Sequence, residues 1–244
     1  MLDFGLSLHR GNMGLVVMTE PSTLNPREVN FKLLLSGLLI LMLAGPVLRE
    51  YTSLDNAELL EMIFGSSILL FVASLAGNMR AFWMGLILAV IALVCAVLAV
   101  LLNLTIFRYL MQGAGLVFCI IAVRYSAREV FLAGAVDLNK IIGSVCIYLL
   151  LVVSWAILYD FLELLTPGSF TGLSPGEGVS RLDEFVYFSL VTITTLGYGD
   201  TTPTNLVAGF FAGMEALVGV FYTAILVASL VGDFMSRNQV RDQQ

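Results

Sequence analysis

Six consecutive residues, Thr195 to Asp200, have the types and the spacing to coordinate a dehydrated cation. They read Thr-Leu-Gly-Tyr-Gly-Asp and stand between two long apolar runs. Gly197 and Gly199 alternate with residues that carry side chains, and glycine adopts positive φ angles that other residues avoid. Successive carbonyls of such a strand can turn to one side. A row of carbonyls can replace the water shell of an ion, and the Thr195 hydroxyl can add one more oxygen ligand.

The composition of the chain is that of an integral membrane protein. Of the 244 residues, 59% are apolar and 12% are charged, and the mean hydropathy is +0.94. An ordinary soluble domain is about 45–50% apolar and about a quarter charged. The net charge of −6, with 12 scattered basic residues, argues against a nucleic-acid surface or a polybasic lipid anchor.

Side chains that could support catalysis or bind a resident metal are few. The only histidine is His9, and the three cysteines Cys95, Cys119 and Cys146 lie inside apolar runs without metal-ligand spacing. The sequence offers neither a nucleophile with a base nor a phosphate-binding loop. We therefore expect that the protein is not an enzyme.

A helix that spans a membrane needs about 20 mostly apolar residues, and the sequence contains six such segments. They are Phe31–Leu48, Leu59–Gly77, Ala81–Leu102, Leu104–Val123, Ile141–Tyr159 and Leu206–Val231. A seventh apolar stretch, Leu182–Ile193, is too short to span the membrane. Because it lies between two spans whose neighbouring ends are on the same side, it must enter the membrane and return. The sequence predicts an all-α membrane protein with six transmembrane helices and a re-entrant helix between the fifth and the sixth.

The ends of this short helix have suitable chemistry. Ser180 and Asp183 form a capping-box pattern, and Asp183 and Glu184 suit the positive N-terminal end of a helix. The C-terminal end would point its carbonyl dipole into the interior of the membrane. That end attracts a cation.

The segment Thr195–Asp200 resembles the T-x-G-Y-G-D signature of potassium-channel selectivity filters. The similarity covers the outer helix, the re-entrant pore helix, the filter and the inner helix, about Lys140–Asp233. The resemblance implies a homotetramer in a lipid bilayer, because one filter strand supplies only one wall of a ring. It also implies that the Thr195 hydroxyl and four backbone carbonyls hold dehydrated potassium ions, those of Thr195, Leu196, Gly197 and Tyr198.

The residues around the filter depart from the family pattern in two ways. Leu196 stands where the family more often has Val or Ile, and Tyr187-Phe188 stand where many members have two tryptophans. We expect Asp200 to accept a hydrogen bond from Tyr187, and the Tyr198 side chain to point away from the ions and pack against the pore helix. The residues that support the filter are then Tyr187, Phe188, Gly199 and Asp200.

The inner helix of the family bends at a glycine about 20 residues beyond the last filter glycine, a place that Gly219 occupies. Glycine in mid-helix weakens a helix by about 1 kcal/mol relative to alanine, which favours a hinge, although small residues also allow close packing. A stripe at helical spacing is predicted to line the cavity and gate below the filter, with Gly219, Val220, Thr223 and Val227. Its narrowing toward Phe234 would form a hydrophobic gate.

Glu215 is the only charged residue inside the sixth predicted span. An ionisable group at membrane depth is a candidate for a functional role. Its helical phase places it toward the pore helix or a neighbouring subunit, and the pore helix offers Ser189 and Thr192 as partners. It is therefore either a hydrogen-bonded structural carboxyl or a proton sensor.

The fourth predicted helix lacks the arginine ladder of a voltage sensor. Each charge that crosses the membrane contributes about 2.3 kcal/mol per 100 mV, and steep gating needs about three or four charges per subunit. Between Arg108 and Arg124 lie 15 uncharged residues. We expect weak or absent voltage gating.

These predictions divide the chain into five regions. They are a cytoplasmic N-terminal head (1–30), a four-helix transmembrane region (31–125), a cytoplasmic linker (126–139), a potassium-channel pore domain (140–235) and a short cytoplasmic tail (236–244). In this topology nine Lys and Arg residues lie on the side of the two termini and three on the opposite side. The positive-inside rule therefore makes both termini cytoplasmic. We expect a multi-pass protein of the cell membrane without a separate regulatory domain in this chain.

The implied function is passive, potassium-selective conduction. A nonselective cation channel, a non-conducting channel subunit and a secondary transporter are the alternatives. Transporters commonly have inverted repeats and paired broken helices, whereas this sequence has a single re-entrant element.

Overall fold

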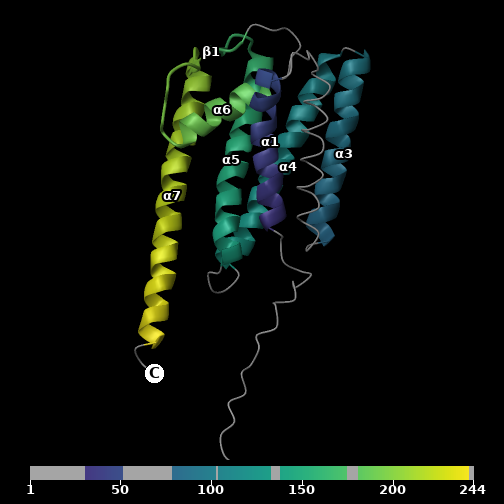
Figure 1. Ribbon diagram of the computed structural model, residues 1–244. Helices are drawn as coiled ribbons and strands as arrows, with labels where there is room; N and C mark the ends of the chain where they lie inside the picture. The colour runs from purple at the N-terminus through teal and green to yellow at the C-terminus, as the bar shows by residue number, and fades with distance from the viewer. Residues whose placement is uncertain (1–30, 52–78, 103, 133–137, 175–180, 242–244) are drawn as a thin grey trace, which may run out of the picture.

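The computed structural model of the chain describes residues 31–51, 79–102, 104–132, 138–174 and 181–241. Nearly all of the regular structure in these ranges is helical (Figure 1). The elements are α1 (Phe31–Tyr51), α3 (Met79–Leu102), α4 (Thr105–Leu132), α5 (Leu138–Leu165), β1 (Phe170–Thr171), α6 (Leu182–Ile193), β2 (Thr202–Pro203) and α7 (Leu206–Arg241).

Long apolar helices confirm the prediction of a helical membrane protein. Three helical segments are long and apolar enough to cross a membrane, Thr105–Phe131, Leu138–Leu165 and Leu206–Ser229, and two shorter ones, Phe31–Leu43 and Trp83–Ala99, are also apolar. The second predicted span, Leu59–Gly77, lies outside the described residues, so the count of six spans stays a prediction. Four helices run beyond their predicted ends, since α1 continues to Tyr51, α4 to Leu132, α5 to Leu165 and α7 to Arg241.

Helices α3, α4 and α5 pack in chain order, whereas α1 packs against α5. Helix α3 packs on α4, and α4 on α5, while α5 also contacts α1 and α6. The short helix α6 lies between the upper parts of α5 and α7, and the rest of α7 extends below it (Figure 1). Helix α5 is thus the element that joins the first part of the chain to α6.

Two apolar clusters, one on each side of α5, hold this arrangement. The first joins α1, α3, α4 and α5, and its buried members include Phe31, Leu34, Leu38, Ala89, Phe118, Cys119, Ala122, Cys146, Leu150 and Val153. The second joins α5, β1, α6 and α7, and its buried members are Val152, Ala156, Tyr159, Phe170, Phe185, Val186, Phe188, Ile193 and Ala208. Burial of such side chains stabilises a fold by about 1.5–3 kcal/mol each. The second cluster places α6 against the outer and inner helices.

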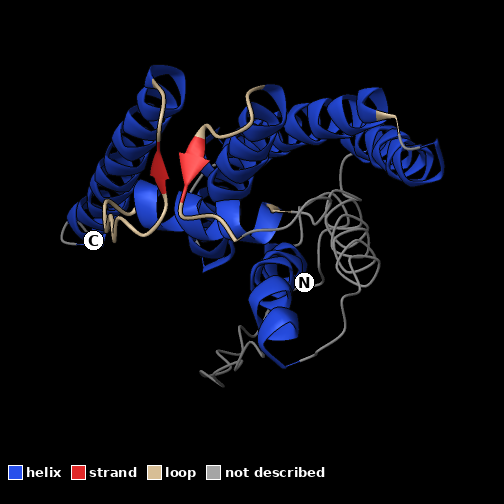
Figure 2. Ribbon diagram, turned by 90° about the horizontal axis from the view of Figure 1, so that it is seen from above, coloured by secondary structure: helices blue, strands red, loops and turns tan. Residues whose placement is uncertain are grey.

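A short antiparallel pair of strands closes the upper end of this region. Phe170 lies opposite Pro203 and Thr171 opposite Thr202, and Figure 2 shows the two strands side by side. The loop that follows α5 is thereby fixed to the segment that follows residue 200.

Candidate ion-conduction site

The re-entrant helix has the bounds that the sequence predicts, Leu182–Ile193. Its first turn contains Asp183 and Glu184, as the positive end of a helix favours. The predicted cap Ser180 lies outside the described residues; Arg181 occupies the N-cap position and makes no side-chain capping bond.

The chain turns back on itself where α6 ends. The N–H of Thr195 donates to the Thr192 carbonyl at 2.9 Å, and the N–H groups of Leu196 and Gly197 both donate to the Val191 carbonyl, at 2.9 and 3.3 Å. Three successive N–H groups are therefore satisfied by the last turn of α6. The carbonyls differ from the N–H groups: within the described residues, no hydrogen bond is donated to the carbonyls of Thr195, Leu196, Gly197 and Tyr198.

Every second residue of the filter segment, Thr195–Asp200, has a left-handed backbone. The φ angles are +58° at Thr195, +57° at Gly197 and +80° at Gly199. The sequence predicts the positive φ of the two glycines but not that of Thr195, which carries a Cβ and is strained there. A backbone that alternates in this way can turn successive carbonyls to one side.

One face of the filter segment is open in the single chain. Residues 194–200 are all exposed, and Tyr198 has 67% of its surface exposed. The sequence led us to expect that the Tyr198 side chain packs against the pore helix. Within its own chain it does not.

The outer end of the filter segment is held from two sides. The Tyr187 hydroxyl donates to Asp200 Oδ2 at 2.7 Å, as the sequence suggests, and the N–H of Thr201 donates to Oδ1 at 2.9 Å. These bonds, the one from Tyr187 above all, lower the pKa of Asp200 below its ordinary value. On the other side, a Cβ at Gly172 would lie 1.9 Å from the Asp200 carbonyl oxygen, so only glycine fits there.

Phe188, by contrast, is buried away from the filter, with its ring 5.1 Å from that of Tyr159.

Residues that the sequence reasoning missed shape the loop before α6. Glu163 Oε1 accepts from the N–H of Gly168 at 2.9 Å, and its Oε2 accepts from the N–H of Phe170 at 3.2 Å. Arg181 forms an ion pair with the same carboxylate at 3.4 Å. Glu163 lies just beyond the predicted span Ile141–Tyr159, and two of its partners are backbone groups that no sequence motif marks.

Gly219 is the point at which the inner helix touches the end of the pore helix. A Cβ there would lie 2.0 Å from the Ile193 carbonyl oxygen, which also accepts a hydrogen bond from the Tyr148 hydroxyl at 3.2 Å. Helix α7 is continuous through this residue. The structure therefore gives Gly219 a close-packing role, and the hinge stays a prediction.

The predicted cavity stripe is open in the single chain. Val220 and Val227 have 52% and 60% of their surfaces exposed. The Thr223 hydroxyl bonds back to its own helix, at 3.1 Å from the Gly219 carbonyl and 2.9 Å from that of Val220. The side chain of Phe234 lies outside the described part of the structure.

Glu215 is completely buried between α7, α6 and α5. It contacts Ser189, as the sequence suggests, and the hydroxyl of Tyr159 at 2.6 Å. Thr192 as the second partner is wrong: Tyr159 of α5 reaches the carboxyl instead. The structure thus shows a hydrogen-bonded carboxyl that joins three helices.

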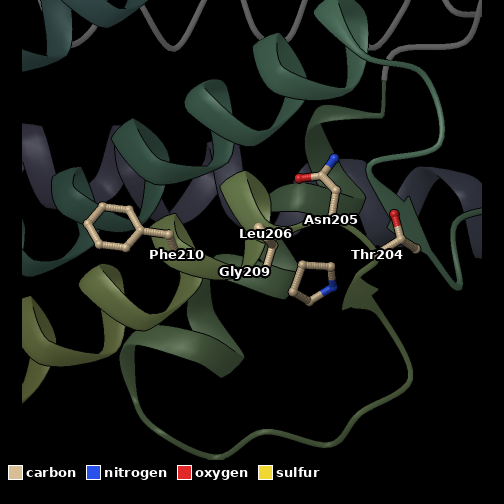
Figure 3. A pocket seen from close by; sticks show the side chains of 6 residues that line it. Thr204, Asn205, Leu206, Gly209 and Phe210 are labelled. Carbon is tan, nitrogen blue, oxygen red and sulfur yellow. The ribbon is translucent and has the colours of Figure 1, made fainter.

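A hollow lies at the start of α7, beside the outer end of the filter segment. Pro203, Thr204, Asn205, Leu206, Gly209 and Phe210 line it. In Figure 3, Thr204 and Asn205 lie on one side of it and Phe210 on the other. Leu206 and Phe210 have 92% and 65% of their surfaces exposed, so the upper part of α7 offers an uncovered apolar surface.

The first prediction concerns the bond between Tyr187 and Asp200. Tyr187→Phe removes the main cause of the lowered pKa, so the pKa of Asp200 should rise toward its ordinary value. A carboxyl whose pKa is lowered in the folded protein stabilises the fold at pH values above its unfolded-state pKa. This stabilisation is lost as the pH falls through the folded-state pKa, so the bond is intact at neutral pH. Carboxyl ¹³C NMR titration of labelled Asp200 measures this change. Tyr109→Phe, which removes a hydroxyl bonded to the Leu164 carbonyl, is the control, and an unchanged Asp200 pKa in Tyr187→Phe would contradict the assignment.

The second prediction concerns Gly219. In Gly219→Ala the new methyl group must displace the Ile193 carbonyl, and overpacking of this kind costs about 1–3 kcal/mol. The melting temperature of the purified protein should fall. Gly213→Ala is the matched control, since a Cβ at Gly213 meets nothing within 4 Å in its own chain. Equal melting temperatures for the two variants would show that the close contact does not matter.

Comparison with known proteins assigns a family. Residues 146–236 match the sequence model of a family described as "Ion channel". Protein LctB of Bacillus caldotenax is 34% identical over 94 residues, which cover 37% of this chain and 69% of that protein. No solved structure matches the chain significantly.

Two plant proteins are similar over shorter stretches. Two-pore potassium channel 3 of Arabidopsis thaliana is 44% identical over 46 residues, 19% of this chain and 11% of that protein. Two pore potassium channel c of Oryza sativa subsp. japonica is 35% identical over 65 residues, 27% of this chain and 14% of that protein. This chain thus covers only a small part of the length of the plant channels. The matched region contains α6, the filter segment and most of α5 and α7, and on these grounds the chain belongs to the potassium channel family.

Proposed function

We propose that this chain is one subunit of a homotetrameric, potassium-selective channel that conducts potassium passively across the cell membrane. The observation that carries the proposal is the filter segment, whose first three N–H groups bond back to α6 while four successive carbonyls receive no hydrogen bond from the described residues. In the proposed pore, where neighbouring subunits would shield these carbonyls from water, polar groups without partners would be costly. A potassium ion that has lost its water shell supplies what these carbonyls lack.

The ion sites consist of the carbonyls of Thr195, Leu196, Gly197 and Tyr198, together with the Thr195 hydroxyl. The alternating positive φ angles at Thr195, Gly197 and Gly199 support this assignment, because they allow neighbouring carbonyls to turn the same way. The side chains of Leu196 and Tyr198 take no part in coordination. Leu196 stands where the family more often has Val or Ile, and this difference therefore leaves the ion sites unchanged.

Four subunits complete the ring. The exposed filter segment and the exposed apolar face of α7 support this, since both lie on the same part of the chain and have no cover within it. In the tetramer the Val220, Thr223 and Val227 stripe lines the cavity below the filter. Tyr198 and the upper end of α7 then pack against a neighbouring subunit.

The third prediction tests conduction. In Gly199→Ala, a residue with φ +80° gains a Cβ, and left-handed backbone costs roughly 1–2 kcal/mol per non-glycine residue, four times over in a tetramer. Potassium flux into liposomes that contain the purified full chain should be lost. Gly113→Ala, in a helical region where a Cβ meets nothing within 4 Å, should keep the flux of the wild type.

Three other results of the same experiment would change the proposal. Equal flux of sodium and potassium would make the protein a nonselective cation channel. Saturable uptake coupled to a second solute would make it a transporter. Absence of flux at every potential and pH would make it a non-conducting subunit.

The fourth prediction concerns voltage. Helix α4 carries Arg108 near its start and Arg124 and Arg128 toward its end, with no charge in the 15 residues between the first two. Single-channel recordings in planar bilayers should therefore show an open probability that changes little with voltage. A steep dependence, equivalent to about three or four charges per subunit, would contradict this part of the proposal.

A further inference from the structure

The Glu215 carboxyl occupies the point where three helices of the pore region meet. Its Oε2 lies 2.6 Å from the hydroxyl of Tyr159 on α5, and its Oε1 is bonded to the hydroxyl of Ser189 on α6. The Ser189 hydroxyl oxygen also lies 2.8 Å from the carbonyl oxygen of Val152 on α5. Both Glu215 and Ser189 are completely buried, so water cannot replace any of these partners.

The number of hydrogens in this group favours a neutral carboxyl. Ser189 has one hydroxyl hydrogen, and a carbonyl or an ionised carboxylate can only accept. If Glu215 were ionised, Ser189 would need two hydrogens to bond both Glu215 and the Val152 carbonyl. If Glu215 carries a proton on Oε1, it donates to Ser189, and Ser189 donates to Val152. Tyr159 then donates to Oε2, and each polar atom of the group has a partner.

The surroundings of Glu215 favour the same state. Its partners, Tyr159 and Ser189, are neutral, and among the described residues it forms no ion pair. An unpaired buried charge is far more costly than a neutral acid with two hydrogen bonds.

Glu163 gives the opposite result by the same reasoning. Its two oxygens face the N–H groups of Gly168 and Phe170 and the guanidinium of Arg181. All three are donors, whereas the Ser189 hydroxyl beside Glu215 has one hydrogen for two acceptors. The chain therefore contains two glutamates near α6 whose hydrogen-bonding environments differ.

Two contacts one helical turn apart join α7 to α6. Glu215 bonds to Ser189 in the middle of α6, and Gly219 touches the Ile193 carbonyl at its end. Residues four apart lie on the same face of a helix. A shift of α7 along its axis would disturb both contacts, and the second lies directly before the filter segment.

We propose that Glu215 is a positioning residue that functions as a neutral carboxylic acid and fixes the pore helix to the inner and outer helices. The protonated carboxyl donates to Ser189 and accepts from Tyr159. Its effect on the filter rests on the proposed function. Its protonation state does not.

The variant Glu215→Gln tests this assignment, because an amide has the hydrogen-bonding groups of the neutral acid. Its NH₂ group donates to Ser189, and its carbonyl accepts from Tyr159. The melting temperature of the purified protein should stay near that of the wild type in Glu215→Gln. It should fall by several degrees in Glu215→Ala, which leaves buried hydroxyls unpaired.

Glu163→Gln is the matched control. The amide would turn an N–H group toward a backbone N–H or toward Arg181, so the melting temperature of Glu163→Gln should fall. A Glu215→Gln variant that loses as much stability as Glu215→Ala would overturn the proposal.

Infrared spectroscopy observes the proton directly. The wild type should show a carbonyl stretch of a protonated carboxylic acid that Glu215→Gln removes and Glu163→Gln retains. Absence of such a difference band would overturn the proposal even if the melting temperatures agree. Since neither measurement needs ion flux, a wild type with this band but without potassium flux would refute the proposed function and leave the assignment of Glu215 in place.

Discussion

The structure depends on a difference between the N–H groups and the carbonyls of the backbone after α6. The N–H groups of Thr195, Leu196 and Gly197 bond to the last turn of the helix. The carbonyls of the same residues receive no hydrogen bond within the described part of the chain. Irregular backbone is tolerated at membrane depth only where it is buried in protein or lines a hydrated path. A strand whose first three donors are satisfied and whose acceptors are free is therefore suited to bind cations and unsuited to lie against lipid.

The rest of the pore region keeps this strand in its strained conformation. Thr195 has a positive φ although it carries a Cβ, and such strain persists only where the surroundings overdetermine it. At the outer end, the bond from Tyr187 and the close approach of Gly172 hold Asp200. At the inner end, Gly219 and Glu215 hold α6. The strand is thus fixed through the helix that precedes it and the residue that ends it.

Local patterns in the sequence predicted the elements that depend on neighbouring residues. The bounds of α6 follow from the apolar run between Arg181 and Thr194, and the positive φ of Gly197 and Gly199 follows from the alternation of glycine. The bond from Tyr187 to Asp200 was suggested by the family resemblance, in which Tyr187 stands at a position where many members have a tryptophan.

Contacts between distant segments were harder to predict. Tyr159 is 56 positions from Glu215, and only the packing of α5 against α7 brings them together, so Thr192 was the wrong partner. The contact of Gly219 with the Ile193 carbonyl has the same origin, because a glycine looks alike in sequence whether it bends a helix or admits a neighbour. The family was identifiable from six residues, whereas its supporting contacts needed the fold.

A structure of the tetramer in rubidium or thallium, heavy ions that can replace potassium, tests the central claim most directly. Our account predicts ion density on the fourfold axis, level with the carbonyls of Thr195, Leu196, Gly197 and Tyr198. Carbonyls that turn away from the axis and bond to protein groups, with no ion density between them, would contradict it.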